Sequence, residues 1–478
     1  MQPCVIRPPF AAGFAALALL ASCQPSEPGS ALPNVVIMFV DDLGYADIGS
    51  HGNPPYDTPH LDRMAAEGVT LSSFYVSQPV CSASRASLLT GNYANRIGIH
   101  NALGTSSTHG IHDDEVTLGE LFKSRGYATA IYGKWHLGHH RQFLPQQHGF
   151  DEFYGIPYSN DMWPYHPESP EAWGDLPTME GDSIVGYNTD QARFTTDFTE
   201  RGVAFIHEQA TAGVPFFLYL PHPMPHVPLF VSDERAGLSG QGLYGDVIME
   251  IDWSMGQIMA ALGEAGLDDN TLVIFSSDNG PWLSYGNHAG SAFPMREGKG
   301  TTFEGGIRVP FLARWPGQLP AGLTVAAPAM IIDLFPTLAR LIDAPLPVHP
   351  VDGKDIWSLL TGKDTDSPHE AYFFWYHRNQ LHSVRSGRWK LHFPHRYRTM
   401  QGQASGRDGI PGKYTQDSIG TALYDLEADL GETSNLAAVH PEVVAHLTSL
   451  ADSMRLHLGD ALTDAAGTDT REPGRLVK

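Results

Sequence analysis

The sequence predicts an α/β protein whose main body is a large, mostly parallel sheet flanked by helices. A smaller C-terminal α+β domain built on an antiparallel sheet is expected to follow it. Three observations support this fold class: apolar runs of buried-strand length, helical patterns between those runs, and short, closely spaced strand-like runs after residue 364. The length of 478 residues and the hydrophobic content of 42% allow a large core.

The strands of the expected parallel sheet are continuous runs rich in β-branched and aromatic residues. They lie at residues 35–40, 128–132, 216–220 and 272–275. Helical patterns, for example at residues 118–124 and 246–262, separate them and can cover both faces of the sheet. Because parallel strands place their carboxyl ends at one edge, the polar residues after each run should meet there. These residues are Asp41 and Asp42, Lys134 and His136, His222 and His226, and Asp278 and Asn279.

The boundary between the two domains is predicted near residues 361–367, where a glycine, a charged run and a proline follow one another. The large catalytic domain would span residues 33–364, closed by a helical segment at residues 330–338, and the smaller domain residues 365–478. Four strands and a final helix are expected in the smaller domain, at residues 371–376, 383–384, 389–393, 423–426 and 441–458. Polar loops at residues 163–187 and 397–418 are expected to shape the pocket.

Residues 1–22 have the pattern of an export signal, with one basic residue and an apolar run at residues 10–20 that is too short to span a bilayer. The run ends at Leu-Ala-Ser-Cys, which resembles a bacterial lipobox with Cys23 as the lipidated residue. An ordinary cleavable leader is the alternative. Residues 23–32 would form a flexible tether. The sequence therefore predicts an exported bacterial lipoprotein, periplasmic or at the cell surface, and Gln24 favours the outer membrane.

The charge and the cysteines exclude several classes of protein. A formal net charge of -23 argues against nucleic acid and against an anionic membrane surface as partners, so only the lipid anchor should contact the membrane. Cys4 and Cys23 belong to the leader and the anchor. Cys81 is then the one thiol of the folded body, and no disulfide framework is expected.

Cys81 opens the run Cys-Ser-Ala-Ser-Arg-Ala-Ser-Leu-Leu-Thr-Gly, at the start of a predicted helix. A lone cysteine in an apolar run is usually a small buried hydrophobe. Its neighbours Ser82, Ser84 and Arg85 fit a core poorly, which favours a chemical role instead. The helix N-terminus would add partial positive charge where an anion can bind.

Hard oxygen donors are concentrated in Asp41, Asp42, Asp278 and Asn279. Carboxylates brought together repel one another unless a cation holds them. Ligation by oxygen alone favours one calcium ion, with magnesium as the alternative. Each pair by itself could also be a helix cap or a turn.

Basic side chains that can bind an anion occur in several of the same segments. The main set is Arg85, Lys134, His136, His226 and Lys299. Lys299 lies in a glycine-rich run, residues 298–306, where the backbone can approach a ligand closely. His222 and His288 are candidate substrate contacts. An acidic protein that handles an anionic substrate needs such a local concentration of bases.

The run from Cys81 to Gly91 resembles the signature of the type I, formylglycine-dependent sulfatases of the alkaline phosphatase superfamily. Residues 126–138 resemble the second signature of that family, and residues 298–306, 387–391 and 423–426 are also similar to it. Ser159 matches a substrate-contacting serine of the arylsulfatase A-like group. Ala83 stands where the family often has proline, which leaves open which maturation enzyme accepts the motif.

The resemblance implies an alkaline phosphatase-like fold and hydrolysis of a sulfate monoester, of an aryl alcohol or a sugar, to the alcohol and inorganic sulfate. A formylglycine-generating enzyme would oxidise Cys81 to an aldehyde, whose hydrate is the nucleophile. The implied calcium ligands are Asp41, Asp42, Asp278, Asn279 and the modified Cys81. The implied substrate contacts are Ser159, His226, Lys299 and His288.

Roles for the basic residues follow from the same resemblance. Arg85 would orient the hydrate, and His136 would take the proton of its second hydroxyl group to expel sulfate. Lys134, His226 and Lys299 would offset the charge on the sulfate oxygens. Either His226 or Lys299 would protonate the leaving alcohol.

Two other functions compete with this interpretation. A phosphodiester or phosphonate monoester hydrolase of the same superfamily can share the aldehyde nucleophile. Two-metal phosphatases of this fold typically have Asp-His where this chain has Asp278-Asn279, which argues against them. A surface lipoprotein that binds sulfated glycans without turnover is the alternative from another class, and the full set of candidate catalytic groups argues against it.

Overall fold

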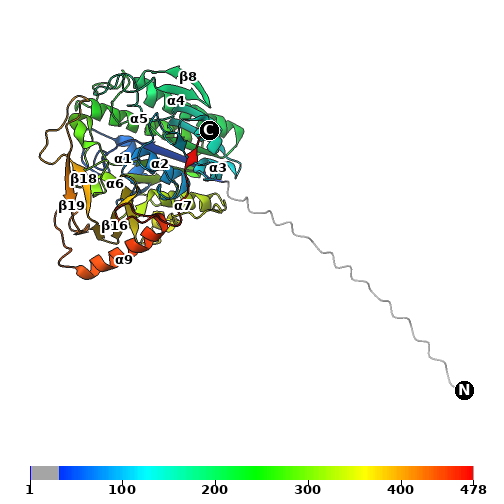
Figure 1. Cartoon of the computed structure of the whole chain (residues 1–478). Helices are drawn as coiled ribbons and strands as arrows, with labels where there is room; N and C mark the ends of the chain where they lie inside the picture. The colour runs from blue at the N-terminus through cyan, green and yellow to red at the C-terminus, as the bar shows by residue number, and fades with distance from the viewer. Residues whose placement is uncertain (2–31, 477–478) are drawn as a thin grey trace. The chain divides into compact units, whose positions relative to one another are not determined.

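A ten-stranded mixed sheet forms the centre of the structure (Figure 1). In spatial order its strands are β13 (Leu323–Val325), β2 (Val69–Leu71), β12 (Phe311–Arg314), β10 (Thr271–Ser277), β1 (Asn34–Val40), β9 (Phe216–Leu220), β5 (Ala128–Lys134), β6 (Glu152–Ile156), β7 (Pro177–Glu180) and β8 (Ser183–Tyr187). The five strands from β10 to β6 are parallel, and β12 and β7 add antiparallel pairings on the two sides. The four predicted strands are confirmed, and they are neighbours in this sheet.

The computed structural model describes residues 32–476, together with Met1. The predicted leader, the lipidation site Cys23 and most of the tether therefore lie outside the described residues. The chain from Leu32 onward forms one compact unit. Within the described part of the chain, no helix is both long and apolar enough to cross a membrane.

Helices cover both faces of the sheet, as its strands require. On β1, Val36 and Met38 belong to one core cluster, which also contains apolar residues of α1 (Pro59–Glu67), α4 (Phe194–Ala212) and α5 (Leu243–Glu264). Val35 and Ile37 point the other way and pack in a second cluster with α2 (Cys81–Thr90), α3 (Leu118–Lys123) and α7 (Leu334–Leu341). Alternate residues of one buried strand thus serve two cores. Two further helices are a single turn long, α6 (Glu304–Ile307) and α8 (Trp357–Leu360).

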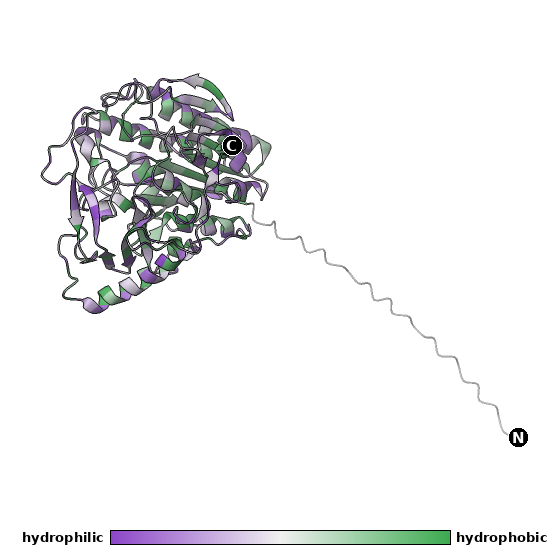
Figure 2. Ribbon diagram, viewed as in Figure 1, coloured by the Kyte–Doolittle hydropathy of each residue, from purple (hydrophilic) through white to green (hydrophobic). Residues whose placement is uncertain are grey.

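The C-terminal region contains the predicted antiparallel sheet and final helix. The sheet consists of β15 (Tyr372–Tyr376), β16 (Gln380–Ser386), β17 (Trp389–His392) and β20 (Ala422–Asp425), and α9 (Pro441–Leu458) packs on it. Phe374 and Val384 share the core cluster of β1 residue Val35, so the hydrophobic core continues from the main sheet into this region. Figure 2 shows apolar residues concentrated in the central strands and a mixture of polar and apolar residues along α9.

Smaller elements surround these two sheets. A three-stranded sheet contains β11 (Arg308–Val309), β3 (Phe74–Tyr75) and β14 (Ala329–Met330), and β21 (Gly474–Arg475) pairs with β4 (His109–Gly110). A separate two-stranded antiparallel ribbon consists of β18 (His395–Thr399) and β19 (Thr415–Ile419).

Three segments differ from their predictions. Residues 163–187 and 397–418 were expected to be loops, but they contain the strands β7, β8, β18 and β19. Because β8 and β19 are almost entirely exposed, their sequences lack the apolar pattern on which a strand prediction depends. Residues 330–338 begin with the end of β14 and a short 3-10 turn before α7, since the carboxylate of Asp333 accepts the backbone N–H groups of Met330 and Lys354.

Candidate active site

The ends of neighbouring strands bring the predicted polar residues together at one edge of the main sheet. Asp41 and Asp278 directly follow β1 and β10, which lie side by side. The backbone N–H of Asp42 donates to Oδ1 of Asp278 over 3.2 Å. Lys134, the last residue of β5, donates its ammonium group to Asp41. Segments far apart in the sequence therefore contribute to one buried cluster.

Cys81 is the first residue of α2 and lies inside this cluster. Its Sγ is 3.4 Å from Oδ1 of Asp41 and 3.5 Å from Nζ of Lys299, and only 2% of the residue is exposed. The preceding residue, Val80, is extended and provides no side-chain cap, so the helix N-terminus stays open to an anion. Burial and the charge of Asp41 raise the pKa of the thiol. An unmodified thiol would therefore be a poor nucleophile here at neutral pH.

The acidic residues form a compact group of oxygen donors. Asn279 donates its Nδ2 to Oδ1 of Asp42 over 2.7 Å, while its own Oδ1 is buried and accepts no hydrogen bond from the described residues. Asp41, Asp42, Cys81 and His226 each present a ligand atom within 4.8 Å of the others. An amide oxygen left without a donor next to carboxylates fits a cation ligand, because such a buried acceptor is otherwise costly.

Arg85 forms ion pairs with two of these carboxylates. Its Nη2 is 2.9 Å from Oδ2 of Asp41 and 2.9 Å from Oδ2 of Asp278, and its Nη1 donates to the carbonyl oxygen of Lys134 over 2.8 Å. All three charged side chains of these ion pairs are fully buried. The position of Arg85 four residues after Cys81 places both on adjacent turns of α2, so one helix contributes the nucleophile and its neighbouring guanidinium.

Two lysines lie on either side of the cluster. Lys134 donates to Oγ of Ser159 over 3.0 Å, so the predicted serine does lie next to the site. Lys299 is 2.7 Å from Oδ1 of Asp42. Its ammonium group also lies 4.5 Å from the centroid of the Trp282 ring. The sequence analysis missed Trp282, although an aromatic residue three positions after Asn279, in a loop that leaves a parallel strand, was a usable signal.

The carboxylates differ in their pKa values. Burial alone would raise the pKa of Asp41, but the charges of Lys134 and Arg85 outweigh it and hold that pKa well below its usual range. Burial and the neighbouring charge of Asp41 raise the pKa of Asp278 to about 7, although Arg85 opposes the change. As the pH rises, Asp41 therefore loses its proton well before Asp278 does.

Both predicted catalytic histidines are buried and favour the neutral form. Burial and the charge of Lys299 lower the pKa of His226, whose Nε2 is 3.7 Å from Asp42. Burial and the charge of Lys134 lower the pKa of His136 well below its usual range. Nε2 of His136 is 2.8 Å from the carbonyl oxygen of Leu103. Its other ring nitrogen has no partner among the described residues and can accept a proton.

Two other histidines that were predicted to contact substrate, His222 and His288, lie outside the cluster. His222 is buried, and its Nε2 lies 3.1 Å from Oγ of Ser254 on α5, so it packs behind the sheet edge. His288 is half-buried beside Gly409, in a separate loop, and makes no hydrogen bond or ion pair to the cluster in the described structure. Its role as a substrate contact stays a prediction.

Comparison with known proteins decides the family. The Sulfatase family model matches residues 33–344, and the model for the C-terminal region of aryl-sulfatase matches residues 367–469. The chain belongs to the sulfatase family. Arylsulfatase A of Bos taurus is 38% identical over an alignment of 480 positions, which covers 95% of this chain and 91% of the relative. N-acetylgalactosamine-6-sulfatase of Canis lupus familiaris is 38% identical and covers 89% and 85%.

The fold of this sulfatase agrees with that assignment. The crystal structure of the PsFucS1 sulfatase from Pseudoalteromonas sp. superposes with a TM-score of 0.78 and 26% identity, over 91% of each chain. The large mixed sheet with helices on both faces and the smaller antiparallel sheet are therefore the alkaline phosphatase-like sulfatase fold. By family, the protein is a sulfuric ester hydrolase.

Proposed function

We propose that this sulfatase hydrolyses a sulfate monoester of a sugar or an aryl alcohol, with a formylglycine made from Cys81 as nucleophile and one calcium ion as cofactor. The observation that carries the proposal is the convergence of Cys81 with the oxygen donors that follow β1 and β10. The hydrated aldehyde would supply a hydroxyl group that attacks sulfur. Water and the ester are converted to an alcohol, sulfate and a proton.

The donor set supports a hard dication. Asp41, Asp42, Asp278 and Asn279 offer only oxygen atoms, and the Oδ1 of Asn279 lacks a hydrogen-bond donor among the described residues. Such a set favours calcium, and magnesium remains the alternative. When bound, the cation would polarise a sulfate oxygen and stabilise the charge that develops on it.

The balance of charge at the site favours an anion once a dication is bound. The three carboxylates Asp41, Asp42 and Asp278 face the three cations Arg85, Lys134 and Lys299. A divalent ion would make the sum positive within an otherwise acidic protein, which favours a sulfate ester over a neutral ligand.

The surrounding side chains can then be given roles. Lys134 and Ser159 are hydrogen-bonded to each other and would contact sulfate oxygens together. Lys299 and His226 both approach Asp42, and one of them would protonate the leaving alcohol. His136, with a free ring nitrogen, would accept the proton from the second hydroxyl group of residue 81.

Peptide mass spectrometry across residue 81 tests the nucleophile. The mature protein, produced together with a formylglycine-generating enzyme, should carry an aldehyde in place of the thiol and should release sulfate from 4-nitrophenyl sulfate. Cys81→Ala is the matched control, because its methyl group offers no thiol or hydroxyl group from which an aldehyde could be made. Full activity with an intact thiol at residue 81 would overturn the proposal.

The same preparation separates sulfatase from phosphodiesterase activity. 4-Nitrophenyl sulfate and bis(4-nitrophenyl) phosphate, a phosphodiester, share a leaving group, so the ratio of their kcat/KM values reports on the transferred group. We expect the sulfate ester to be preferred. A preference for the phosphodiester would favour the phosphodiester or phosphonate hydrolase alternative.

We also propose that the protein is exported and anchored through a lipid on Cys23. The support is the leader and lipobox pattern in the sequence, since these residues lie outside the described structure. Mass spectrometry of the N-terminal peptide from membrane fractions would detect the diacylated cysteine, and Cys23→Ala should release the protein from the membrane. A soluble wild-type protein with an unmodified Cys23 would contradict the proposal.

A further inference from the structure

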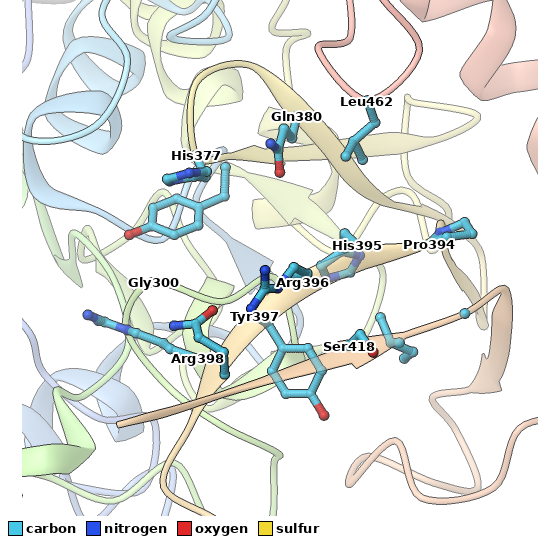
Figure 3. Close-up of a pocket in the computed structure, with 14 residues that line it drawn as sticks. Gly300, His377, Gln380, Pro394, His395, Arg396, Tyr397, Arg398, Ser418 and Leu462 are labelled. Carbon is cyan, nitrogen blue, oxygen red and sulfur yellow. The ribbon is translucent and has the colours of Figure 1, made fainter. Parts of the chain in front are cut away.

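A groove of about 1010 Å³ lies between the C-terminal sheet and the β18–β19 ribbon (Figure 3). It begins next to the segment that leads into α2. Gly300, which lines the groove, donates its N–H to the carbonyl oxygen of Pro79 over 3.0 Å. Tyr376, which also lines it, packs against the apolar cluster that contains Val80. The groove therefore adjoins the nucleophile, although none of the catalytic residues lines it.

One wall of the groove is the exposed face of the β18–β19 ribbon. In this antiparallel pair Arg396 is opposite Ser418, and Arg398 is opposite Gln416. Because alternate residues share a face, these four side chains point to the same side. Figure 3 shows the two arginines along β18, with Gln380 of the C-terminal sheet across the pocket.

The charge of the groove is opposite to that of the protein. The chain has 53 acidic and 30 basic residues, yet among the described residues no aspartate or glutamate lines the groove. The one carboxylate of β19, Asp417, does not line it but accepts a hydrogen bond over 3.0 Å from the hydroxyl group of Tyr397, which does. The groove is thus a basic, hydrogen-bonding surface that suits an anionic, hydroxyl-rich ligand.

The two arginines have different partners. Arg398 donates to the carbonyl oxygen of Lys299, and its guanidinium group lies 4.5 Å from the centroid of the Tyr414 ring. These contacts fix the side chain of Arg398 and link β18 to the backbone of Lys299. Arg396 is exposed, and its side chain makes no ion pair or hydrogen bond to any described residue, although its backbone is part of the β18–β19 pairing. It lies two residues further from the catalytic centre, about 7 Å along the strand.

We propose that this groove holds the sugar residues next to the one that carries the scissile sulfate, and that Arg396 binds an anionic group on them. The inference rests on the proposed sulfatase function and specifies its substrate: an oligosaccharide with at least two anionic groups, in preference to a small aryl sulfate. A guanidinium group suits this role because it binds a sulfate or a carboxylate through two parallel hydrogen bonds. Gln416 and Ser418 supply partners for sugar hydroxyl groups.

Calorimetric binding to the full mature chain carrying Cys81→Ala tests the groove without turnover. Three tetrasaccharides serve as probes: one of ι-carrageenan with sulfate groups only, one of hyaluronan with carboxylates only, and neutral maltotetraose. At least one anionic probe should bind more tightly than maltotetraose, and the tighter of the two identifies the anionic group. Arg396→Gln in the same background should weaken that binding about tenfold or more, the effect of a lost charge-assisted contact. Arg407→Gln, an exposed arginine that does not line the groove, is the matched control.

Three results would overturn the inference: equal binding of all three probes, unchanged binding by Arg396→Gln, or an equal loss with Arg407→Gln, which would indicate unspecific attraction. A kinetic arm separates this inference from the proposed function. If the mature enzyme carries no formylglycine at residue 81 and releases no sulfate from 4-nitrophenyl sulfate or from the ι-carrageenan tetrasaccharide, while binding still depends on Arg396, the proposed chemistry fails and the groove stands. If the enzyme is active, the inhibition constant of the bound tetrasaccharide should rise more in Arg396→Gln than the KM for 4-nitrophenyl sulfate does.

Discussion

Removal of the Arg85 guanidinium tests how much the buried ion cluster contributes to stability. Its Nε and Nη2 atoms are 2.9–3.2 Å from the carboxylates of Asp278 and Asp41, and the three side chains are fully buried. Arg85→Met keeps an unbranched, uncharged stem and leaves two buried carboxylates without the guanidinium group. Removing one partner of a buried pair costs about 3–5 kcal/mol. Because Lys134 remains beside Asp41, we expect about 4 kcal/mol, roughly a thousandfold in the folding equilibrium.

Unfolding by guanidinium chloride at several pH values, followed by circular dichroism, measures this loss. Loss of the guanidinium charge raises the folded-state pKa of both carboxyl groups. The deficit from each group grows only between its folded-state pKa in the parent and its higher pKa in the variant. Because the pKa of Asp278 is already about 7 in the parent, its part of the deficit should appear as the pH rises above about 7, whereas the part from Asp41, whose parent pKa lies well below its usual range, is present from acidic pH upward. The deficit of Arg85→Met should therefore be larger at about pH 9 than at pH 5–7. Chelator in all samples keeps cation binding from masking the difference.

Arg340→Met is the matched control for this experiment. Arg340 pairs with Asp355 at the surface, where the two side chains are 47% and 37% exposed. The loss of such a pair should cost no more than about 1 kcal/mol. If Arg85→Met shifted the unfolding midpoint no more than Arg340→Met does, the buried cluster would add no net stability, and the reasoning from burial would be refuted.

Three further predictions concern the metal, the C-terminal sheet and the catalytic loop. Asn279→Ala should reduce the rise in melting temperature that calcium produces after chelation, measured by calorimetry, because it removes a buried oxygen donor; an unchanged rise would count against this ligand. Lys390→Met should lower the unfolding free energy by about 3–5 kcal/mol, because Lys390 is the fully buried partner of two buried glutamates, and a chemical denaturation midpoint equal to that of the parent would contradict it. Gly300→Ala should lower kcat for 4-nitrophenyl sulfate and cost about 1 kcal/mol of stability, since φ is +79° and a Cβ atom would lie 2.6 Å from the guanidinium of Arg398; parent-like values would contradict it.

Elements with a strong local pattern were predictable from the sequence. The four apolar runs correspond to β1, β5, β9 and β10, and the final helix has the predicted bounds, Pro441–Leu458. Cys81 begins a helix, as its run predicts. A buried strand needs a continuous apolar run, and the start of a helix favours particular residue types. Both can therefore be recognised within a few residues of sequence.

Elements without such a pattern were not predictable. The β18–β19 ribbon presents a polar face to solvent, and its strand structure depends on pairing across a long connection. His222 resembled a site residue because it follows β9, yet it bonds to Ser254 behind the sheet. Its neighbour in the chain, His226, lies four residues further on and enters the cluster.

The sequence by itself determined which chemical groups this sulfatase has: a motif cysteine, oxygen donors and bases, several of them just after a predictable strand or at the start of a helix. Only the tertiary structure decided which of them meet. Arg85 contacts Asp278 across 193 residues of chain, and Lys299 contacts Cys81 across 218. Such contacts depend on how the helices on the two faces pack against one sheet. The free energy of that packing comes from residues throughout the chain, so no short segment of sequence predicts it.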